Sequence, residues 1–316
     1  MKVVVTGGAG FIGANVCSAL TRAGIDDVVA FDNLSTGSRQ NLENTGATLA
    51  EADLLDLSAL SDAAAGATSI VHLAARPSVP RSIADPLASH HANVTGTMHV
   101  LEAARAASVP HVVVASSSSV YGSNPTLPKS EDLKPSPQSP YAASKLAAEA
   151  AALAYTPSFG LGVLSFRFFN VFGPLQAAGH AYAAVIPAFI DAALAGRPLQ
   201  VHGDGEQSRD FTFVESVAAI ITRAVVDRVT SLEPVNLAFG SRVSLLDVIA
   251  LLERLLGVEL EREHLPERRG DVRHSQADQT RLRSLFPDLT PVDLETGIAA
   301  TIDWFRTGCG PLPPAN

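Results

Sequence analysis

The sequence contains few cysteines and no long hydrophobic run. Cys17 and Cys309 are too few and too far apart for a disulfide framework or a zinc site, so no metal centre is expected. No apolar run approaches the ~20 residues that a membrane-spanning helix requires. A strand is expected directly at residues 1–5, which leaves no space for a signal peptide. These absences predict a reduced, cytoplasmic protein.

Positive charge is also scarce. The chain has 23 Lys and Arg residues against 32 Asp and Glu residues, a net charge of -9. Nucleic-acid binding needs clustered Lys and Arg, so a nucleic-acid partner is not expected. Lysine occurs only at Lys2, Lys129, Lys134 and Lys145, which makes Lys145 conspicuous. The apolar fraction of 47% over 316 residues is enough for the core of one large domain or two coupled ones.

The first half of the chain alternates short β-rich runs with Ala-rich helical stretches. Buried strands are expected at 3–6, 28–31, 69–73, 111–116 and 162–166, and helices at 10–23, 57–64, 88–106 and 140–154. Alternating strands and helices predict an α/β fold with a Rossmann-type, doubly wound parallel sheet.

After Asn170 the pattern becomes less regular, and turns such as Gly173-Pro174 divide the sequence. Helices are expected at 214–226 and 244–256. These features predict two domains: residues 1–170 bind a dinucleotide, and residues 171–316 form a smaller C-terminal α/β substrate domain. Segments around 205–238 are expected to return to the first domain.

Gly7, Gly10 and Gly13 lie between the first strand and the first helix. In this context the first glycine allows a tight turn, the second lets the backbone approach a pyrophosphate, and the third lets the helix pack on the sheet. The N-terminus of the helix then offers free N–H groups and a partial positive charge to the phosphates. The motif predicts a dinucleotide site that includes Phe11 and Ile12.

Asp32 ends the second predicted strand, 19 residues after Gly13. A carboxylate at this position accepts hydrogen bonds from the adenosine ribose and repels a 2′-phosphate, so NAD is favoured over NADP. Asp53-Leu54 follows the next strand and is a candidate for adenine contact. Small side chains at Leu73-Ala74-Ala75 would let the cofactor pass close to the backbone, although plain packing also explains them.

Tyr141 and Lys145 are four residues apart on a predicted helix, so they share one face. An ammonium beside a phenol favours the phenolate, which makes a tyrosine usable as a general base. The serines 116–119 follow the fifth strand, at the edge of the sheet where ligands bind. A hydroxyl there can hold the reacting oxygen or relay its proton, although a polar loop would have the same composition.

Together these motifs resemble the extended short-chain dehydrogenase/reductase family, in particular its NAD-dependent nucleotide-sugar epimerases and dehydratases, and most of all bacterial UDP-N-acetylglucosamine (UDP-glucose) 4-epimerases. The resemblance runs from Thr6 to about Phe305. The matching segments are 6–13, Asp32-Asn33, 72–75, 116–122, 141–145, 167–174, 203–210 and 270–275.

The resemblance implies a role for each matching residue. The catalytic group would be Tyr141, Lys145 and Ser117. The cofactor NAD would contact Gly7, Gly10, Phe11, Ile12, Gly13, Asp32, Asn33, Asp53, Leu54, Leu73, Ala74, Ala75, Asn93, Ser116, Tyr141, Lys145 and Phe168. The UDP-sugar would contact Ser78, Ser82, Ser117, Ser118, Tyr141, Asn170, Val185, Arg209, Arg268, Asp271 and Ser275. The resemblance also implies a homodimer formed through helices at 88–106 and 140–154.

Departures from the family pattern narrow the reaction. The dehydratases carry Asp and Glu at the positions of Ser118 and Ser119, and epimerases that invert next to a ketone carry a Cys or His acid near this loop. Without these groups, the resemblance implies a redox-neutral 4-epimerase that acts through a transient 4-keto sugar.

Ser275 corresponds to a family position that is small where N-acetylhexosamines are accepted, so UDP-GlcNAc/UDP-GalNAc is the first substrate pair and UDP-Glc/UDP-Gal the second. Two other interpretations remain open. One is a UDP-uronate epimerase or a nucleotide-sugar dehydratase of antibiotic or polysaccharide biosynthesis, and the other is a non-catalytic NAD-sensing regulator.

Overall fold

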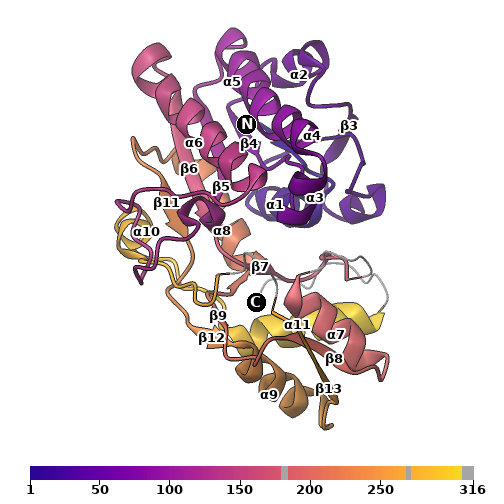
Figure 1. Cartoon of the computed structure of the whole chain (residues 1–316). Coiled ribbons are helices and arrows are strands. Elements are labelled where there is room, and N and C mark those ends of the chain that lie inside the picture. Colours follow the sequence, from indigo (N-terminus) through magenta and orange to yellow (C-terminus); the bar gives the residue numbers. More distant parts are fainter. Residues whose placement is uncertain (179–183, 268–271, 308–316) are drawn as a thin grey trace.

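The computed structural model describes residues 1–178, 184–267 and 272–307, and a seven-stranded sheet forms its centre (Figure 1). Every pair of neighbouring strands in this sheet is parallel. In spatial order the strands are β11 (Val235–Leu237), β6 (Gly162–Phe168), β5 (His111–Ser117), β4 (Ser69–His72), β1 (Lys2–Thr6), β2 (Asp27–Asp32) and β3 (Thr48–Glu51). The predicted Rossmann-type fold class is confirmed.

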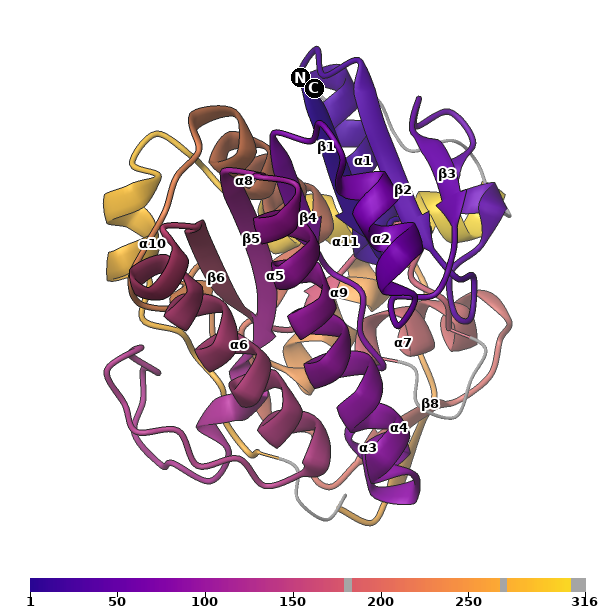
Figure 2. The ribbon, with the colours of Figure 1, turned by 90° about the horizontal axis from the view of Figure 1, so that it is seen from above.

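Helices cover both faces of this sheet (Figure 2). On one face α1 (Phe11–Arg22) packs against α8 (Val214–Asp227), and their apolar side chains share one core with the sheet. On the other face α2 (Leu57–Ala64), α5 (Gly96–Ala106) and α6 (Pro140–Phe159) form a second core. The strand order reverses between β1 and β4, so a crevice is expected where their carboxyl ends diverge.

The helix expected at 88–106 is interrupted in the structure. It consists of α4 (Pro86–His90), a π-helical turn at His91–Thr95, and α5, and it follows a short helix α3 (Val79–Ala84). The helix expected at 140–154 continues to Phe159 as α6, and Pro157 lies in its last turn. Gly160, at φ +72°, then terminates it.

The remaining strands are short and lie beyond the carboxyl edge of the sheet (Figure 1). They pair as β7 (Val171–Phe172) with β10 (Thr212–Phe213), β9 (Ser208–Arg209) with β12 (Val243–Ser244), and β8 (Leu199–His202) with β13 (Arg262–Leu265). The accompanying helices are α7 (Val185–Leu194), α9 (Leu245–Leu256), α10 (Thr280–Leu285) and α11 (Leu294–Thr307).

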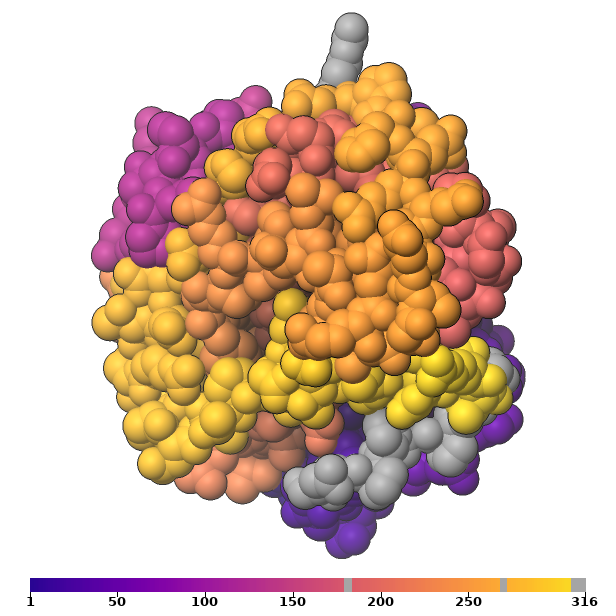
Figure 3. Space-filling view, turned by 90° about the horizontal axis from the view of Figure 1, so that it is seen from below, coloured from indigo at the N-terminus to yellow at the C-terminus, as the bar shows by residue number. Residues whose placement is uncertain are grey.

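A third apolar cluster joins α7, α9 and α11. Seen from below, later parts of the chain form most of this surface (Figure 3). Two segments from within the expected returning region join the central sheet: β11 completes it at one edge, and α8 covers one of its faces. No helix among the described residues is long and apolar enough to cross a membrane.

Candidate active site

The loop after β1 is built from glycine because its backbone lies against two other segments. Gly7 has φ +70°, and a Cβ added to it would lie 2.8 Å from the backbone nitrogen of Ala74. A Cβ on Gly13 would lie 2.0 Å from the carbonyl oxygen of Gly7. Gly10 begins α1 without a side-chain cap, so the N–H groups of the first turn remain available to a phosphate. The loop therefore has the form of a pyrophosphate cradle.

Asp32 shapes the far side of this cradle. Its carboxylate accepts hydrogen bonds from the backbone N–H groups of Ala9, at 3.0 Å, and Leu34, at 2.8 Å. The Asn33 side chain donates to the Asp53 carboxylate at 2.8 Å, which brings together the ends of β2 and β3. The residues predicted to meet adenosine therefore lie next to one another.

His72 is the last residue of β4, and its ring is part of a chain of hydrogen bonds that all point in one direction. Its Nδ1 lies 2.7 Å from the hydroxyl of Thr6, and its Nε2 lies 2.9 Å from the hydroxyl of Thr97. The Thr97 hydroxyl donates to the carbonyl of Asn93 at 2.6 Å, so Nε2 of His72 carries the proton and donates to Thr97. Burial, with a smaller contribution from Lys145, lowers the pKa of His72 to about 3, which keeps the ring neutral.

The catalytic candidates meet at the carboxyl end of β5. Ser117 is the last residue of β5, and Tyr141 and Lys145 lie on successive turns of α6. The Ser117 hydroxyl forms a hydrogen bond with the Tyr141 phenol. Lys145 is only 5% exposed. The sequence placed Ser117 at the end of a strand and the other two residues on one helix, and the fold brings that strand and helix together.

Burial acts on both ionisable groups of this cluster. It raises the pKa of Tyr141, and the hydrogen bond from Ser117 partly opposes that rise. Burial lowers the pKa of Lys145 to about 8, although the negative charge of Glu149 acts to raise it. The tyrosine therefore depends on a positive charge nearby to ionise at neutral pH.

Two predicted ligand contacts, Ser82 and Asn93, are buried and bind other protein groups. Ser82 is 0% exposed, and its hydroxyl accepts a hydrogen bond from the backbone N–H of Tyr141. Asn93 is 1% exposed, and its side chain binds the backbone of Arg76 and the hydroxyl of Ser144. Protein groups thus occupy their polar atoms in this structure, and direct ligand contact by these side chains stays a prediction.

A cleft of about 810 Å³ lies among β7, α7, β8 and β13. Asn170, Val185 and Arg209, all predicted to bind the sugar nucleotide, line it. Asn170 adopts φ +24°, and its side-chain amide donates to the carbonyl of Asp210. Arg209 donates to the carbonyls of Ser208 and Arg273 while it faces the cleft. The lining combines apolar side chains with two arginines, a composition that suits a nucleotide, and it also includes two carboxylates, Asp191 and Glu263.

The other predicted contact residues are distributed around the cluster. Ser78 is half-buried and caps α3, where its φ of +96° marks a strained turn. The hydroxyl of Ser116 is buried and makes no hydrogen bond within the described ranges. Ser118 and Phe168 are half-buried at the ends of β5 and β6, and Ser275 is half-buried beside Ser208. Arg268 and Asp271 lie outside the described residues.

Comparison with known proteins agrees with this geometry. Residues 3–238 match the model of the NAD dependent epimerase/dehydratase family. The chain is 37% identical over 312 residues to the UDP-glucose 4-epimerase of Mycolicibacterium smegmatis, with 97% of this chain and 99% of the relative covered.

Two solved structures are similar in both sequence and fold. One is the UDP-N-acetylglucosamine 4-epimerase of Methanobrevibacter ruminantium in complex with UDP-N-acetylmuramic acid, with 36% identity, a TM-score of 0.91, and coverage of 97% of this chain and 98% of that one. The other is MoeE5 in complex with UDP-glucuronic acid and NAD, with 35% identity, a TM-score of 0.86, and coverage of 98% and 100%.

Proposed function

The chain belongs to the NAD dependent epimerase/dehydratase family, and on that basis we propose that it interconverts UDP-GlcNAc and UDP-GalNAc, with UDP-Glc and UDP-Gal as a second substrate pair. The observation that carries the proposal is the meeting of Ser117, at the end of β5, with Tyr141 and Lys145 on α6, which packs against that strand. A redox-neutral epimerase needs this minimal group, together with a bound dinucleotide.

NAD is the cofactor, and the residues present fit it. The close approach of Gly7 to Ala74 leaves backbone rather than side chains to face the dinucleotide. The carboxylate of Asp32 lies where adenosine ribose hydroxyls are recognised. When bound, NAD accepts a hydride from C4 of the sugar and returns it to that carbon.

Tyr141 is proposed to remove the proton from the C4 hydroxyl and later to return it. Ser117, hydrogen-bonded to the phenol, holds the reacting oxygen in line with that transfer. The ammonium of Lys145 stabilises the phenolate form of Tyr141 and holds the nicotinamide ribose. Arg209 anchors the diphosphate, so the 4-keto sugar can rotate and present its opposite face without leaving the cleft.

The choice of sugar rests on Ser275. The choice of reaction rests on the absence of an acid–base pair beside Ser117. A serine at position 275 leaves space for an acetamido group. Ser118 and Ser119 provide no carboxylate to eliminate water, which disfavours a dehydratase. A uronate 4-epimerase is the second candidate, because the similar MoeE5 structure contains UDP-glucuronic acid.

We also propose a homodimer and two domains. Exposed alanines form a stripe along α6, at Ala143, Ala147, Ala150 and Ala154, and exposed Leu87 and Met98 lie on the neighbouring helices. Small side chains would permit two copies of α6 to approach closely. Light scattering should give twice the mass of the chain. The proposed domains are residues 1–170, joined by returning segments around 205–238, and the rest of 171–316.

The substrate proposal is tested by proton NMR of the anomeric region after incubation with UDP-GlcNAc, UDP-Glc or UDP-glucuronic acid. New signals of the C4 epimer at unchanged mass are expected, and they should appear fastest from UDP-GlcNAc. Turnover of only the uronate would replace the sugar assignment. Loss of one water from the product would indicate a dehydratase. No product from any of the three, with NAD bound, would favour an NAD-sensing regulator.

A further inference from the structure

A charged pair is buried directly behind Lys145. Glu149 lies one helical turn after Lys145 on the same side of α6, and it is 3% exposed. Arg167, the second-to-last residue of the neighbouring strand β6, is also 3% exposed. Burying charges is costly, and a buried ion pair is often no more stabilising than apolar side chains of the same volume. The pair therefore calls for an explanation other than stability.

The contact between Glu149 and Arg167 is bidentate. Nε of Arg167 donates to one carboxylate oxygen at 3.0 Å, and an Nη donates to the other at 2.7 Å. Two parallel charge-assisted bonds fix the carboxylate in orientation and hold its negative charge. The carboxylate of Glu149 is thus held in one position behind Lys145.

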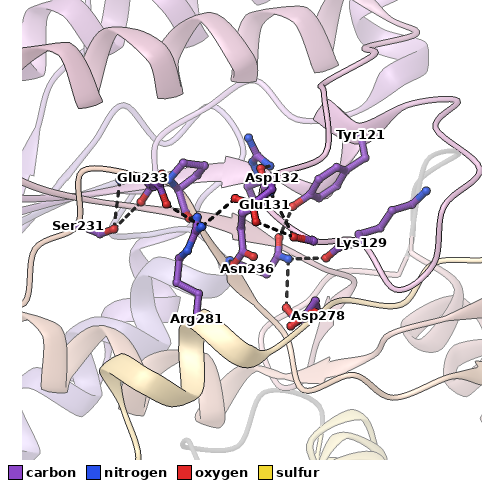
Figure 4. A network of polar contacts seen from close by, with 12 residues as sticks. Tyr121, Lys129, Glu131, Asp132, Ser231, Glu233, Asn236, Asp278 and Arg281 are labelled. Atoms are coloured by element: carbon purple, nitrogen blue, oxygen red, sulfur yellow. Dashed lines mark hydrogen bonds and ion pairs between the residues drawn. The ribbon is translucent and has the colours of Figure 1, made fainter.

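Arg167 is itself held by several distant segments. It donates to the carbonyl of Glu131 at 3.4 Å, and its guanidinium lies 4.8 Å from the centre of the Tyr121 ring. The Tyr121 hydroxyl bonds Asn236 on β11 at 2.6 Å, and the backbone N–H of Asn236 bonds Glu131 at 2.7 Å. Figure 4 shows Tyr121, Glu131 and Asn236 converging within this network. The arginine therefore has little freedom to leave Glu149.

The charges that face Lys145 come from three elements. His72, at the end of β4, is neutral because burial lowers its pKa, and its ring accepts from Thr6 and donates to Thr97. Tyr141, on α6, gains negative charge only when it ionises. Glu149 is therefore the constant negative charge among these neighbours, and Arg167 on β6 lies behind it.

We propose that Glu149, held by Arg167, is a positioning residue that keeps the Lys145 side chain protonated and aimed toward Tyr141. The inference rests on the proposed role of Lys145. It is consistent with the two opposing influences on the pKa of Lys145, since burial lowers that value to about 8 while Glu149 acts to raise it. Without Glu149, burial would act unopposed, and Lys145 would lose its proton closer to neutral pH.

The test measures the titration of Lys145 directly, without substrate. Because the chain has only four lysines, protein labelled with [¹³Cε]lysine gives few signals, and Lys145→Arg identifies the one of interest. In Glu149→Gln the midpoint of this signal should fall by about one pH unit, as expected from the loss of a charge one helical turn away. The alkaline limb of the epimerisation rate should shift by the same amount.

Glu102→Gln is the matched control. Glu102, on α5, forms a bidentate pair with Arg105 at the surface. It also binds Tyr155, which lies ten residues after Lys145 on α6. Its removal should leave the Lys145 midpoint unchanged. Glu149→Asp retains the negative charge and should keep the midpoint near that of the wild type.

Lowered turnover in Glu149→Gln with an unchanged Lys145 midpoint would overturn the proposal, because the pair would then be only structural. If Glu149→Gln does not fold, Glu149→Gln/Arg167→Met removes both buried charges, and a smaller downward shift is expected. An unchanged midpoint in the double variant would also overturn the proposal. A shifted midpoint in a chain without epimerase activity would support the inference while refuting the proposed function.

Discussion

The hydroxyl of Ser82 accepts a hydrogen bond from the backbone N–H of Tyr141 at 3.0 Å, although 59 residues separate them. Tyr141 lies in the first turn of α6, where backbone N–H groups have no partner within the helix. Ser139 caps the N–H of Ala142, and Ser82 satisfies that of Tyr141. The segment after β4 therefore positions the start of the helix that carries the catalytic tyrosine.

Replacing Ser82 with Ala should lower both stability and turnover. The substitution leaves a buried N–H unsatisfied, at a cost of about 1–3 kcal/mol, and it loosens Tyr141. We expect a lower urea midpoint and a kcat reduced by about tenfold. Ser89→Ala is the control, because the equally buried Ser89 hydroxyl binds Asp85 rather than α6. Equal losses of kcat in both variants would argue against this link.

Tyr141→Phe should abolish turnover without loss of the fold or of bound NAD. Removing a general base typically costs about 10²–10⁴-fold in rate. Tyr155→Phe is a matched control on the same helix, because that hydroxyl binds Glu102 on the outer surface. NMR of product formation, together with NAD retained after gel filtration, measures both effects. Substantial activity in Tyr141→Phe would assign the proton transfer to another group.

Asp32→Asn should weaken NAD binding and reduce the preference for NAD over NADP. The neutral amide no longer repels a 2′-phosphate, and it accepts only one of the two backbone hydrogen bonds that Asp32 now receives. An affinity loss of about tenfold is expected. Calorimetric titration with each dinucleotide tests this, with the exposed residue Asp62 replaced by Asn as the control. An unchanged NAD/NADP ratio would contradict the assignment.

Ser275→Tyr should separate the two proposed substrate pairs. The ring would fill the space left for an acetamido group, so turnover of UDP-GlcNAc should fall by about 100-fold while that of UDP-Glc persists. Ser275→Ala retains the space and should preserve both activities. If Ser275→Tyr slowed both sugars equally, Ser275 would not discriminate between them.

The neutral His72 should make the protein sensitive to acid. Its pKa is about 3 in the fold, against an ordinary value of 6.5. The unfolded chain takes up a proton as pH falls through 6.5, but the folded chain does not, so the unfolding free energy should fall between pH 6.5 and 3 by on the order of 4 kcal/mol.

Urea denaturation at several pH values measures the effect of His72. His72→Gln should show a shallower dependence, and His111, whose pKa burial also lowers, contributes part of what remains. An identical dependence in the two proteins would rule out His72 as a source.

Local sequence signals predicted the elements that build the site. Glycines at 7, 10 and 13 after a β-branched run defined the cradle, and the spacing of Tyr141 and Lys145 placed them on one helix face. The five strands expected in the first half occur within about two residues of their predicted bounds. These signals are readable because they lie within one or two elements.

Long-range contacts had no such signal. The expected return of segments around 205–238 did not specify an edge strand at Val235–Leu237, and nothing near Asn236 predicts that it bonds Tyr121, 115 residues away. The π-helical turn that aims Asn93 at Arg76 also lacks a sequence pattern, so a continuous helix was the natural expectation. For the buried position of Glu149 the sequence contained one signal, a carboxylate on the apolar face of the helix that became α6.

The position of β11 has a consequence for biosynthesis. During translation the other strands of the central sheet leave the ribosome well before residues 235–237, so one edge of β6 stays unpaired until then. Until β11 arrives, Asn236 cannot bind Tyr121, and Arg167 lacks part of the surroundings that fix it. A nascent chain that ends near residue 170 would carry every proposed catalytic residue and still be an unfinished, aggregation-prone sheet.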